Sequence, residues 1–196
     1  MTTYNAEISA GSLMPLESRR IAAFLLTHPD DNAWRSALIE DNLLQKKAPA
    51  TALRQASLIR NRLNTLDETA WDMIAHREQE VAIQLLMVAA VRHSQLLADF
   101  IHDVYIDHQR RLNLAISSGD WEGFFTECAH RDTSVTGWSA STQAKLIQVI
   151  LRILKEAKYL ESTRSMKLTP QSLHPDVRRY LAAQSDNSLI ELLERA

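Results

Sequence analysis

Apolar residues recur along this chain at steps of three and four, the spacing that places them on one face of an α-helix. Capping residues and prolines mark the helix boundaries: Asp30 precedes one apolar series, Pro49 opens another and Asp67 precedes a third. Only 4 Gly and 5 Pro occur, too few for a sheet-rich fold with many tight turns. Helices are therefore expected over 15–28, 30–42, 49–64, 67–74, 77–108, 121–130, 139–158 and 176–183, with a modest helix after Ser185.

The longest helical stretch, 77–108, is expected to be either two helices or one helix that bends. From Val81 to Val91 it is apolar on all sides, which is typical of a helix at the centre of a core. This run is about half the length needed to cross a bilayer, and it contains Gln84. A buried helix and no membrane partner are expected.

One segment near the C-terminus has a different pattern. Residues 159–161 and 166–168 flank a polar Ser-Thr-Arg-Ser turn, which predicts a small two-stranded hairpin. The expected fold class is all-α with a small C-terminal β-hairpin wing. The expected regions are an N-terminal helical subdomain (1–66), central buried helices (67–118) and a winged-helix-like C-terminal region (119–196).

The charges are segregated along the chain. The formal net charge of -2 by itself gives no hint of a nucleic-acid partner. However, residues 43–65 hold five basic residues and no acid, and residues 133–169 hold six basic residues against two acids. Residues 66–132 hold twelve acids against five arginines. Such opposed blocks predict two electropositive surfaces, each on a helix with its approach loop.

The second basic block forms a stripe on its predicted helix. At steps of four and three, one face collects Ser141, Lys145, Gln148, Arg152 and Lys155. The opposite face collects Leu146, Ile150, Ile153 and Ala157. Such a stripe is usually only the solvated side of an amphipathic helix, but this one contains no acid. Ser141 and Thr142 at the helix start add hydroxyl groups that can donate to phosphate, and Arg164 and Lys167 follow near the hairpin tip.

The order of short helix, loop, amphipathic helix and basic hairpin is that of the winged variant of helix-turn-helix. In that motif the second helix enters the major groove and the wing contacts the DNA backbone. The helix at 121–130, a loop through Gly137 and a helix from Ser139 supply the first three parts. Lys158 stands before the first predicted wing strand, where a small residue is common, so the exit geometry stays open.

The first basic block is a weaker signal. Its candidate phosphate ligands are Lys46, Lys47, Arg54 and Arg62. Leu58 is also expected to point outward, which favours a protein contact as readily as a phosphate contact. The segment is expected to form an electropositive corner of a helical bundle, with a second helix-turn-helix as the alternative.

Candidate catalytic and metal-binding residues are few. Carboxylates and imidazoles gather in one stretch, at Asp99, His102, Asp103, Asp107 and His108. A solvated acidic face is the simpler interpretation, because a zinc-enzyme helix needs a histidine pair four residues apart and a positioned base. Cys128 and His130 lie two residues apart on one predicted helix and point in different directions. No Gly-rich phosphate loop, Gly-x-Ser-x-Gly or Cys-x-x-Cys motif occurs, so no catalysis, metal or cofactor is expected.

The single cysteine cannot form an intramolecular disulfide. Residues 1–12 lack the cationic start and continuous apolar stretch of a secretory signal. A cytoplasmic location is therefore expected.

Several stretches, taken in order, carry a family resemblance. They are Asn5–Leu13, Glu17–Arg20, Leu44–Lys47, His93–Leu97 and Trp138–Thr163. They resemble BrxA proteins, the small accessory proteins of bacterial BREX phage-exclusion systems. The resemblance implies an all-helical protein with winged-helix character and a role in phage defence through DNA. It supplies no catalytic residue, and a likeness of such proteins to RNA-binding antitermination factors of the NusB type is an alternative.

The leading hypothesis is a non-enzymatic protein that binds double-stranded DNA mainly through phosphate. Its candidate DNA-binding residues are Lys46, Lys47, Arg54, Arg62, Ser141, Thr142, Lys145, Gln148, Arg152, Lys155, Arg164 and Lys167. A second hypothesis is an adaptor that docks other BREX components through its acidic middle, Leu58 and the C-terminal leucines Leu189, Leu192 and Leu193. A third is RNA binding, which would favour single strands or hairpins over duplex DNA.

Overall fold

The structure, a computed structural model, describes residues 4–196 and divides the chain into two compact units. One unit is Leu13–His93. The other joins the chain up to Ser12 with Ser94–Ala196, and we call it the Ser94–Ala196 unit. The sequence-based regions 1–66, 67–118 and 119–196 stay a prediction, and the first three residues lie outside the described ones.

The Leu13–His93 unit is built from five helices that begin where caps and prolines predict. They are α1 (Pro15–Leu25), α2 (Asp31–Ile39), α3 (Pro49–Leu63), α4 (Glu68–His76) and α5 (Gln79–His93). The Asp30 carboxylate accepts a hydrogen bond from the Ala33 N–H at 2.7 Å and caps α2. The Asp67 carboxylate accepts from the Ala70 N–H at 3.0 Å and caps α4.

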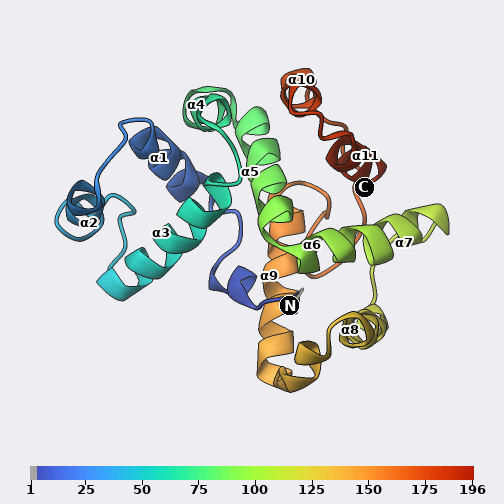
Figure 1. Ribbon diagram of the computed structural model, residues 1–196. Coiled ribbons are helices and arrows are strands. Elements are labelled where there is room, and N and C mark those ends of the chain that lie inside the picture. Colours follow the sequence, from blue (N-terminus) through green and yellow to red (C-terminus); the bar gives the residue numbers. More distant parts are fainter. Residues whose placement is uncertain (1–3) are drawn as a thin grey trace. The chain divides into compact units, whose positions relative to one another are not determined.

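Helix α5 supplies the core of this unit, as its apolar sequence predicts. Every residue from Val81 to Val91 is buried, Gln84 included. Helices α1, α3 and α4 pack against α5 (Figure 1). No single helix among residues 4–196 is long and apolar enough to span a membrane; one broken pair, Gln79–His93 with Gln95–Arg110, passes on length and composition alone.

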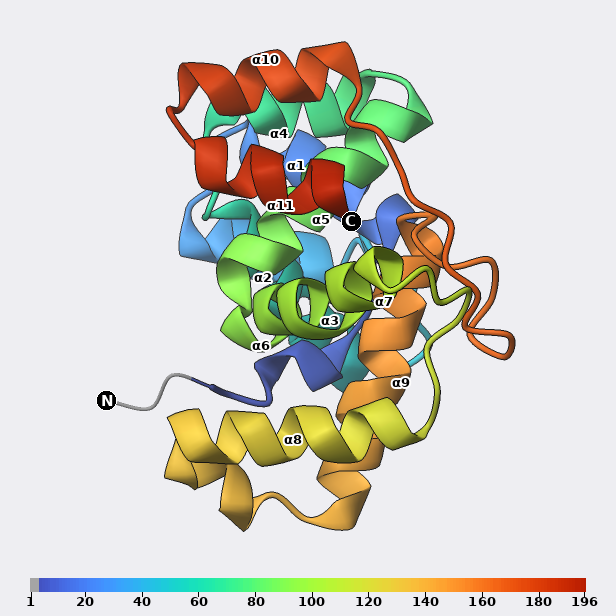
Figure 2. The ribbon, with the colours of Figure 1, turned by 90° about the vertical axis from the view of Figure 1, so that its right-hand side faces the viewer.

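The Ser94–Ala196 unit is also helical. Its elements are the 3-10 helix η1 (Glu7–Ala10), α6 (Gln95–Phe100), the π-helical turn η2 (Ile101–Tyr105), α7 (Ile106–Arg110), α8 (Gly119–Arg131), the 3-10 helix η3 (Thr133–Gly137), α9 (Ala140–Glu156), α10 (Pro175–Ala183) and α11 (Asn187–Arg195). Ser94 divides the predicted 77–108 stretch, because its hydroxyl accepts from the Leu97 N–H at 3.3 Å and caps α6. Helices α10 and α11 lie against each other (Figure 2).

Aromatic side chains form the core of the Ser94–Ala196 unit. Phe100 stacks on Trp121 with ring centroids 4.3 Å apart, and Phe124 meets Phe100 edge-on at 5.2 Å. The Tyr105 hydroxyl donates to the Tyr159 carbonyl at 2.7 Å, which ties η2 to the segment that follows α9. Buried aromatic contacts therefore join α6 to α8, and a separate tyrosine pair joins η2 to the segment after α9.

The predicted β-hairpin wing is wrong. The described residues contain no β-strand, and residues 159–169 pair only through the isolated bridges Leu160↔Leu168 and Ala115↔Lys167. The pairing stays short because the turn coils back on itself, with the Met166 N–H donating to the Ser162 carbonyl at 3.0 Å. Met166 also has a left-handed backbone (φ 48°), which breaks the alternation of an extended strand. The fold is therefore all-α, with irregular connections in place of a wing.

Candidate nucleic-acid interface

Helix α9 carries the predicted basic stripe, and both of its ends are closed by local hydrogen bonds. At its start, the Ser139 hydroxyl accepts from the Thr142 N–H at 3.2 Å. At its end, the Tyr159 N–H donates to the Leu154 carbonyl at 2.8 Å and the Lys158 N–H donates to the Lys155 carbonyl at 3.1 Å. These two bonds form a Schellman motif with Lys158 in the left-handed region (φ 66°).

The two faces of α9 differ as the sequence predicts. The side chains of Leu146, Ile150, Ile153 and Leu154 are fully buried. The exposed face carries Ser141, Lys145, Gln148, Arg152 and Lys155. Burial of the apolar face holds the helix in place, so the orientation of the polar stripe is set by the core beneath it.

No carboxylate neutralises this stripe. Glu156, the one acid of α9, turns to Ser12, whose hydroxyl donates to Glu156 Oε1 at 2.8 Å. Among residues 4–196, Lys145, Arg152 and Lys155 form no ion pair within 4.0 Å. The exposed face of α9 is therefore an uncompensated positive surface.

Other cations of the same unit are paired. Arg111 binds Asp107 at 3.0 Å, and Arg178 binds Glu194 at 2.8 Å. Arg131 binds Asp103 at 2.7 Å. Arg179 pairs with Asp176, and Arg195 with Glu191. Among the described residues of this unit, the exposed cations without an ion pair therefore lie on α9, on the turn after it and at Arg110.

The hydroxyls at the start of α9 contact one another. The Ser139 Oγ lies 2.9 Å from both the Ser141 Oγ and the Thr142 Oγ1. Ser141 is exposed and Thr142 is half-buried. Ser141 is thus the more accessible of the two predicted phosphate donors.

Arg164 and Lys167 are exposed on the irregular turn that replaces the expected hairpin. Lys167 is held by its backbone, because the Glu161 N–H donates to the Lys167 carbonyl at 3.0 Å. Lys158, also exposed, was not among the predicted site residues. Its position after a long basic stripe is the sequence signal that could have identified it.

The first basic block is largely neutralised or buried. Lys46 forms an ion pair with Glu17 at 2.5 Å, and both side chains are mostly covered. Arg62 is only 4% exposed, so its guanidinium cannot reach a phosphate, and the structure removes it from the predicted site. Leu58, expected to point outward, is buried as well. Lys47 and Arg54 remain exposed.

The ion pair with Lys46 also changes the pKa of Glu17. Burial opposes ionisation of the Glu17 carboxyl, but the hydrogen bond from Lys46, a backbone hydrogen bond and the charges of Lys46 and Arg20 outweigh burial and lower the pKa of Glu17. Lys46 is therefore held to a carboxylate that stays ionised at neutral pH.

The carboxylates and imidazoles between Asp99 and His108 do not converge on one metal-binding position. His102 contacts Asp103 at 2.8 Å, and His108 contacts Asp120 at 3.0 Å. Arg131 binds both Asp99 and Asp103. A cleft of about 540 Å³ beside η2 and α8 is lined by these paired groups. Of its carboxylates, Asp103 pairs with Arg131, Asp107 pairs with Arg111 and Asp120 contacts His108.

Cys128 and His130 do not form a catalytic pair. Cys128 is fully buried, whereas His130 is exposed. Burial raises the pKa of the Cys128 thiol to about 11. The reactive thiolate is therefore a minor species at neutral pH.

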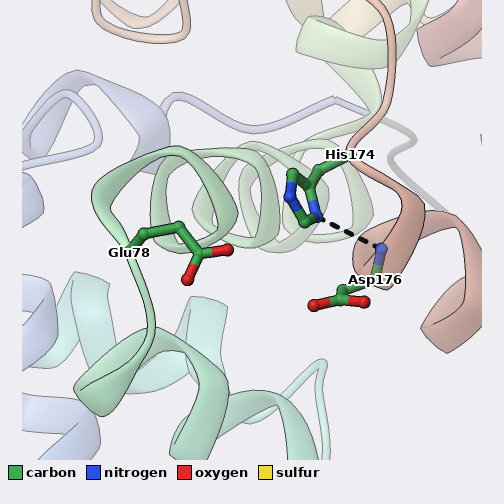
Figure 3. A group of neighbouring side chains, drawn as sticks. All are labelled: Glu78, His174 and Asp176. Atoms are coloured by element: carbon green, nitrogen blue, oxygen red, sulfur yellow. Dashed lines mark hydrogen bonds between the residues drawn. The ribbon is translucent and has the colours of Figure 1, made fainter.

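The His174 side chain caps the start of α10. Its Nδ1 accepts a hydrogen bond from the backbone N–H of Asp176 at 3.2 Å (Figure 3), while the Asp176 carboxylate pairs with Arg179. Glu78, also drawn in Figure 3, belongs to the other unit. Structural zinc sites use four ligands and catalytic ones three protein ligands, so His174 and Asp176 alone do not make a metal site.

Comparisons with known proteins agree on one family. The BrxA family model matches residues 2–185. The chain is 35% identical over 191 residues to a BREX protein BrxA of Paramagnetospirillum magneticum, covering 97% of this chain and 96% of that protein. It is also 35% identical to a BREX protein BrxA of Escherichia coli O9:H4 over 188 residues, which cover 96% of this chain and 88% of the relative.

A solved structure has the same fold. It is the crystal structure of an uncharacterized protein from Magnetospirillum magneticum, with a TM-score of 0.91 and 33% sequence identity. The match covers 99% of this chain and all of that one.

Proposed function

This chain belongs to the BrxA family, and we propose that it is a non-enzymatic accessory protein of a BREX anti-phage system that binds duplex DNA. The contact runs mainly through phosphate, from Lys145, Arg152 and Lys155 of α9 and from Arg164 and Lys167 of the turn that follows. Other BREX components are its protein partners.

One observation carries the proposal: the exposed face of α9 holds three cations and no acid, and Glu156, which follows Lys155, accepts a hydrogen bond from Ser12 instead of pairing with them. By contrast, Arg111, Arg131 and Arg178 of the same unit are paired with carboxylates. Unpaired Lys and Arg on one rigid face are the groups that neutralise phosphates and release counterions. Gln148 and Ser141 lie on the same face and can donate hydrogen bonds to phosphate or to base edges.

Three further features support the proposal. The acid-free stripe sits on a long helix whose opposite face is anchored in the core, so its spacing is preorganised for a regular ligand such as a duplex. The apolar surface on which an adaptor function was based is largely inside the protein: Leu58, Leu189 and Leu193 are buried. A protonated, buried Cys128 also supports a function without nucleophilic catalysis.

The test is duplex binding by fluorescence anisotropy across a salt series, with wild type and Lys145→Glu/Arg152→Glu. Wild-type affinity should fall steeply with salt, and the double variant should bind on the order of 100-fold more weakly at low salt. The control is Arg179→Glu/Arg195→Glu, which makes the same change of net charge at exposed cations that are already paired.

Three outcomes would contradict the proposal. One is a wild-type affinity that does not change with salt. Another is equal loss in the control and the α9 variant, because net charge rather than the α9 face would then explain binding. The last is a clear preference for hairpin or single-stranded RNA over the duplex, which would favour the RNA hypothesis.

A further inference from the structure

Two leucines stand out on the surface of the Ser94–Ala196 unit. Leu112 is 85% exposed and Leu114 is 75% exposed, in the loop between α7 and α8. Isolated surface leucines are ordinary, but these two lie two residues apart on one short loop. Because both side chains are exposed, they contribute little to the hydrophobic core of the unit, and their place on this loop needs another explanation.

The backbone makes Leu112 still more unusual. The Leu112 N–H donates to the Gln109 carbonyl at 3.0 Å and the Asn113 N–H donates to the His108 carbonyl at 2.9 Å, a Schellman motif at the end of α7. Leu112 takes the left-handed position (φ 59°), which glycine occupies without strain. Of the residues in 4–196 with positive φ, it alone is a large apolar side chain in full view of solvent.

The loop that carries Leu112 and Leu114 is joined to the turn after α9, residues 158–169, which carries Arg164 and Lys167. The Leu168 N–H donates to the Leu114 carbonyl at 2.9 Å, and the Ile116 N–H donates to the Met166 carbonyl at 3.0 Å. The bridge Ala115↔Lys167 lies between these two bonds. The leucines thus stand on a backbone fixed against the segment that carries Lys167.

The surroundings of the leucines are cationic. From Gln109 to Gly119 the chain contains no acid, and Arg110 is exposed beside them. The adjoining turn adds exposed Arg164 and Lys167, and its one acid, Glu161, accepts a hydrogen bond from Ser165 at 3.1 Å. The acids at the edge of this surface are engaged as well: Asp107 pairs with Arg111, and Asp120 accepts hydrogen bonds from Ser117. An apolar tip beside the exposed cations Arg110, Arg164 and Lys167 matches a ligand that is anionic outside and apolar inside.

We propose that Leu112 and Leu114 form an apolar wedge that enters the minor groove of duplex DNA and partly unstacks a base step, while the neighbouring cations hold the flanking phosphates. Such wedges are common in proteins that bend DNA through the minor groove. Two leucines are too small a surface for a stable protein partner, which needs about 800 Å² on each side. This inference rests on the proposed duplex binding and adds to it a deformation of the DNA.

The test uses a Leu112→Asn/Leu114→Ser variant. Asparagine tolerates the left-handed backbone, so the loop keeps its conformation while both apolar side chains are lost. The control is Leu16→Asn, at a leucine of α1 that is 72% exposed. Binding is measured on duplexes that carry 2-aminopurine, whose fluorescence rises on unstacking, and bending is measured by energy transfer between end labels.

Wild type and the Leu16→Asn control should raise 2-aminopurine fluorescence and shorten the end-to-end distance. The loop variant should lose both signals and bind about five- to tenfold more weakly, with the slope of affinity against salt unchanged because no cation is removed. The melting temperature of the loop variant should be equal to or higher than that of wild type, which would show that the lost signals do not come from misfolding.

Each alternative result has a definite meaning. If wild type binds the duplex with a steep salt slope but neither signal changes and the loop variant binds equally well, the wedge is wrong and the proposed function stands. If wild type does not bind the duplex, both are wrong. If the loop variant keeps all DNA signals but no longer retains a BREX component that wild type co-purifies, the leucines contact protein, and the wedge is again wrong.

Discussion

Helices α3 and α9 both lie in strongly basic segments, yet they present different surfaces. In α9 the cations share one exposed face opposite a fully buried apolar face. In and around α3, Arg62 is buried, Lys46 is paired with Glu17 and Arg60 covers the Trp34 ring at 4.7 Å. The net charge of a segment therefore does not give the charge of its surface. The surface charge depends on which cations are neither buried in the core nor paired with an acid.

The largest expected difference between α3 and α9 is in stability, when one arginine of each helix is replaced by alanine. Arg62→Ala removes a side chain that is only 4% exposed from the Leu13–His93 unit and should lower the free energy of unfolding by about 3 kcal/mol. Arg152→Ala acts at an exposed position and should change it by less than about 0.5 kcal/mol. Urea denaturation followed by circular dichroism measures both, and equal losses would contradict the difference in burial.

DNA binding should be affected in the opposite sense. Lys145→Glu/Arg152→Glu should weaken duplex binding on the order of 100-fold, whereas Lys47→Glu/Arg54→Glu in the α3 segment should weaken it less than about fivefold. Anisotropy at one low salt concentration suffices for this comparison. Equal weakening would mean that both basic blocks grip the duplex, as the sequence alone suggested.

The Glu17–Lys46 ion pair should make the folding stability of the protein depend on pH in the acid range. The pKa of Glu17 is lower in the folded chain than its ordinary value of 4.5. Its contribution to stability is therefore complete above about pH 4.5 and is lost as the pH falls through the lower folded pKa. Glu17→Gln should remove this part of the pH dependence.

Urea midpoints of wild type and Glu17→Gln at pH 6 and pH 3.5 make the comparison. The gap between the two proteins should be larger at pH 6. Asp103 and Asp120 also have lowered pKa values, but they are present in both proteins and cancel. A gap that is independent of pH would show that the carboxylate of Glu17 does not stabilise the fold.

Lys158→Gly should have the smallest effect. Glycine occupies the left-handed position without strain, so the variant should be more stable by about 0.5 kcal/mol in thermal or urea unfolding. If Lys158 extends the α9 stripe toward phosphate, duplex binding should weaken by about twofold even though stability rises. Lys158→Asn is the control, since asparagine also tolerates this backbone. A loss of stability in Lys158→Gly would contradict the strain at Lys158.

The α9 stripe could be predicted because it depends on one helix alone. Its apolar residues recur at helical spacing, and the polar residues on the opposite face follow from the same geometry. The caps at Asp30, Asp67 and Ser139 are equally local, since a cap depends on residues within one turn. The family could also be identified from short stretches in order.

The burial of Arg62 and Leu58 could not be predicted in the same way. Both lie at the border of the apolar face of α3, and which side of the border is covered depends on the helices that pack there. The missing wing has a different cause. The Met166 N–H donates back to the Ser162 carbonyl and Met166 takes a left-handed backbone, so the extended pairing of 159–161 with 166–168 stops at one bridge.

The helical class, most helix boundaries, the opposed blocks of charge and the family therefore follow from the amino-acid sequence. Each of these depends on residues that are neighbours along the chain or within one helical turn. The tertiary fold was needed to see which cations have no ion pair, that Glu156 accepts a hydrogen bond from Ser12, and that the loop of Leu112 and Leu114 is bonded to residues 166–168. Those outcomes depend on contacts between distant residues, because packing, rather than local pattern, decides which charges are paired and which side chains meet solvent.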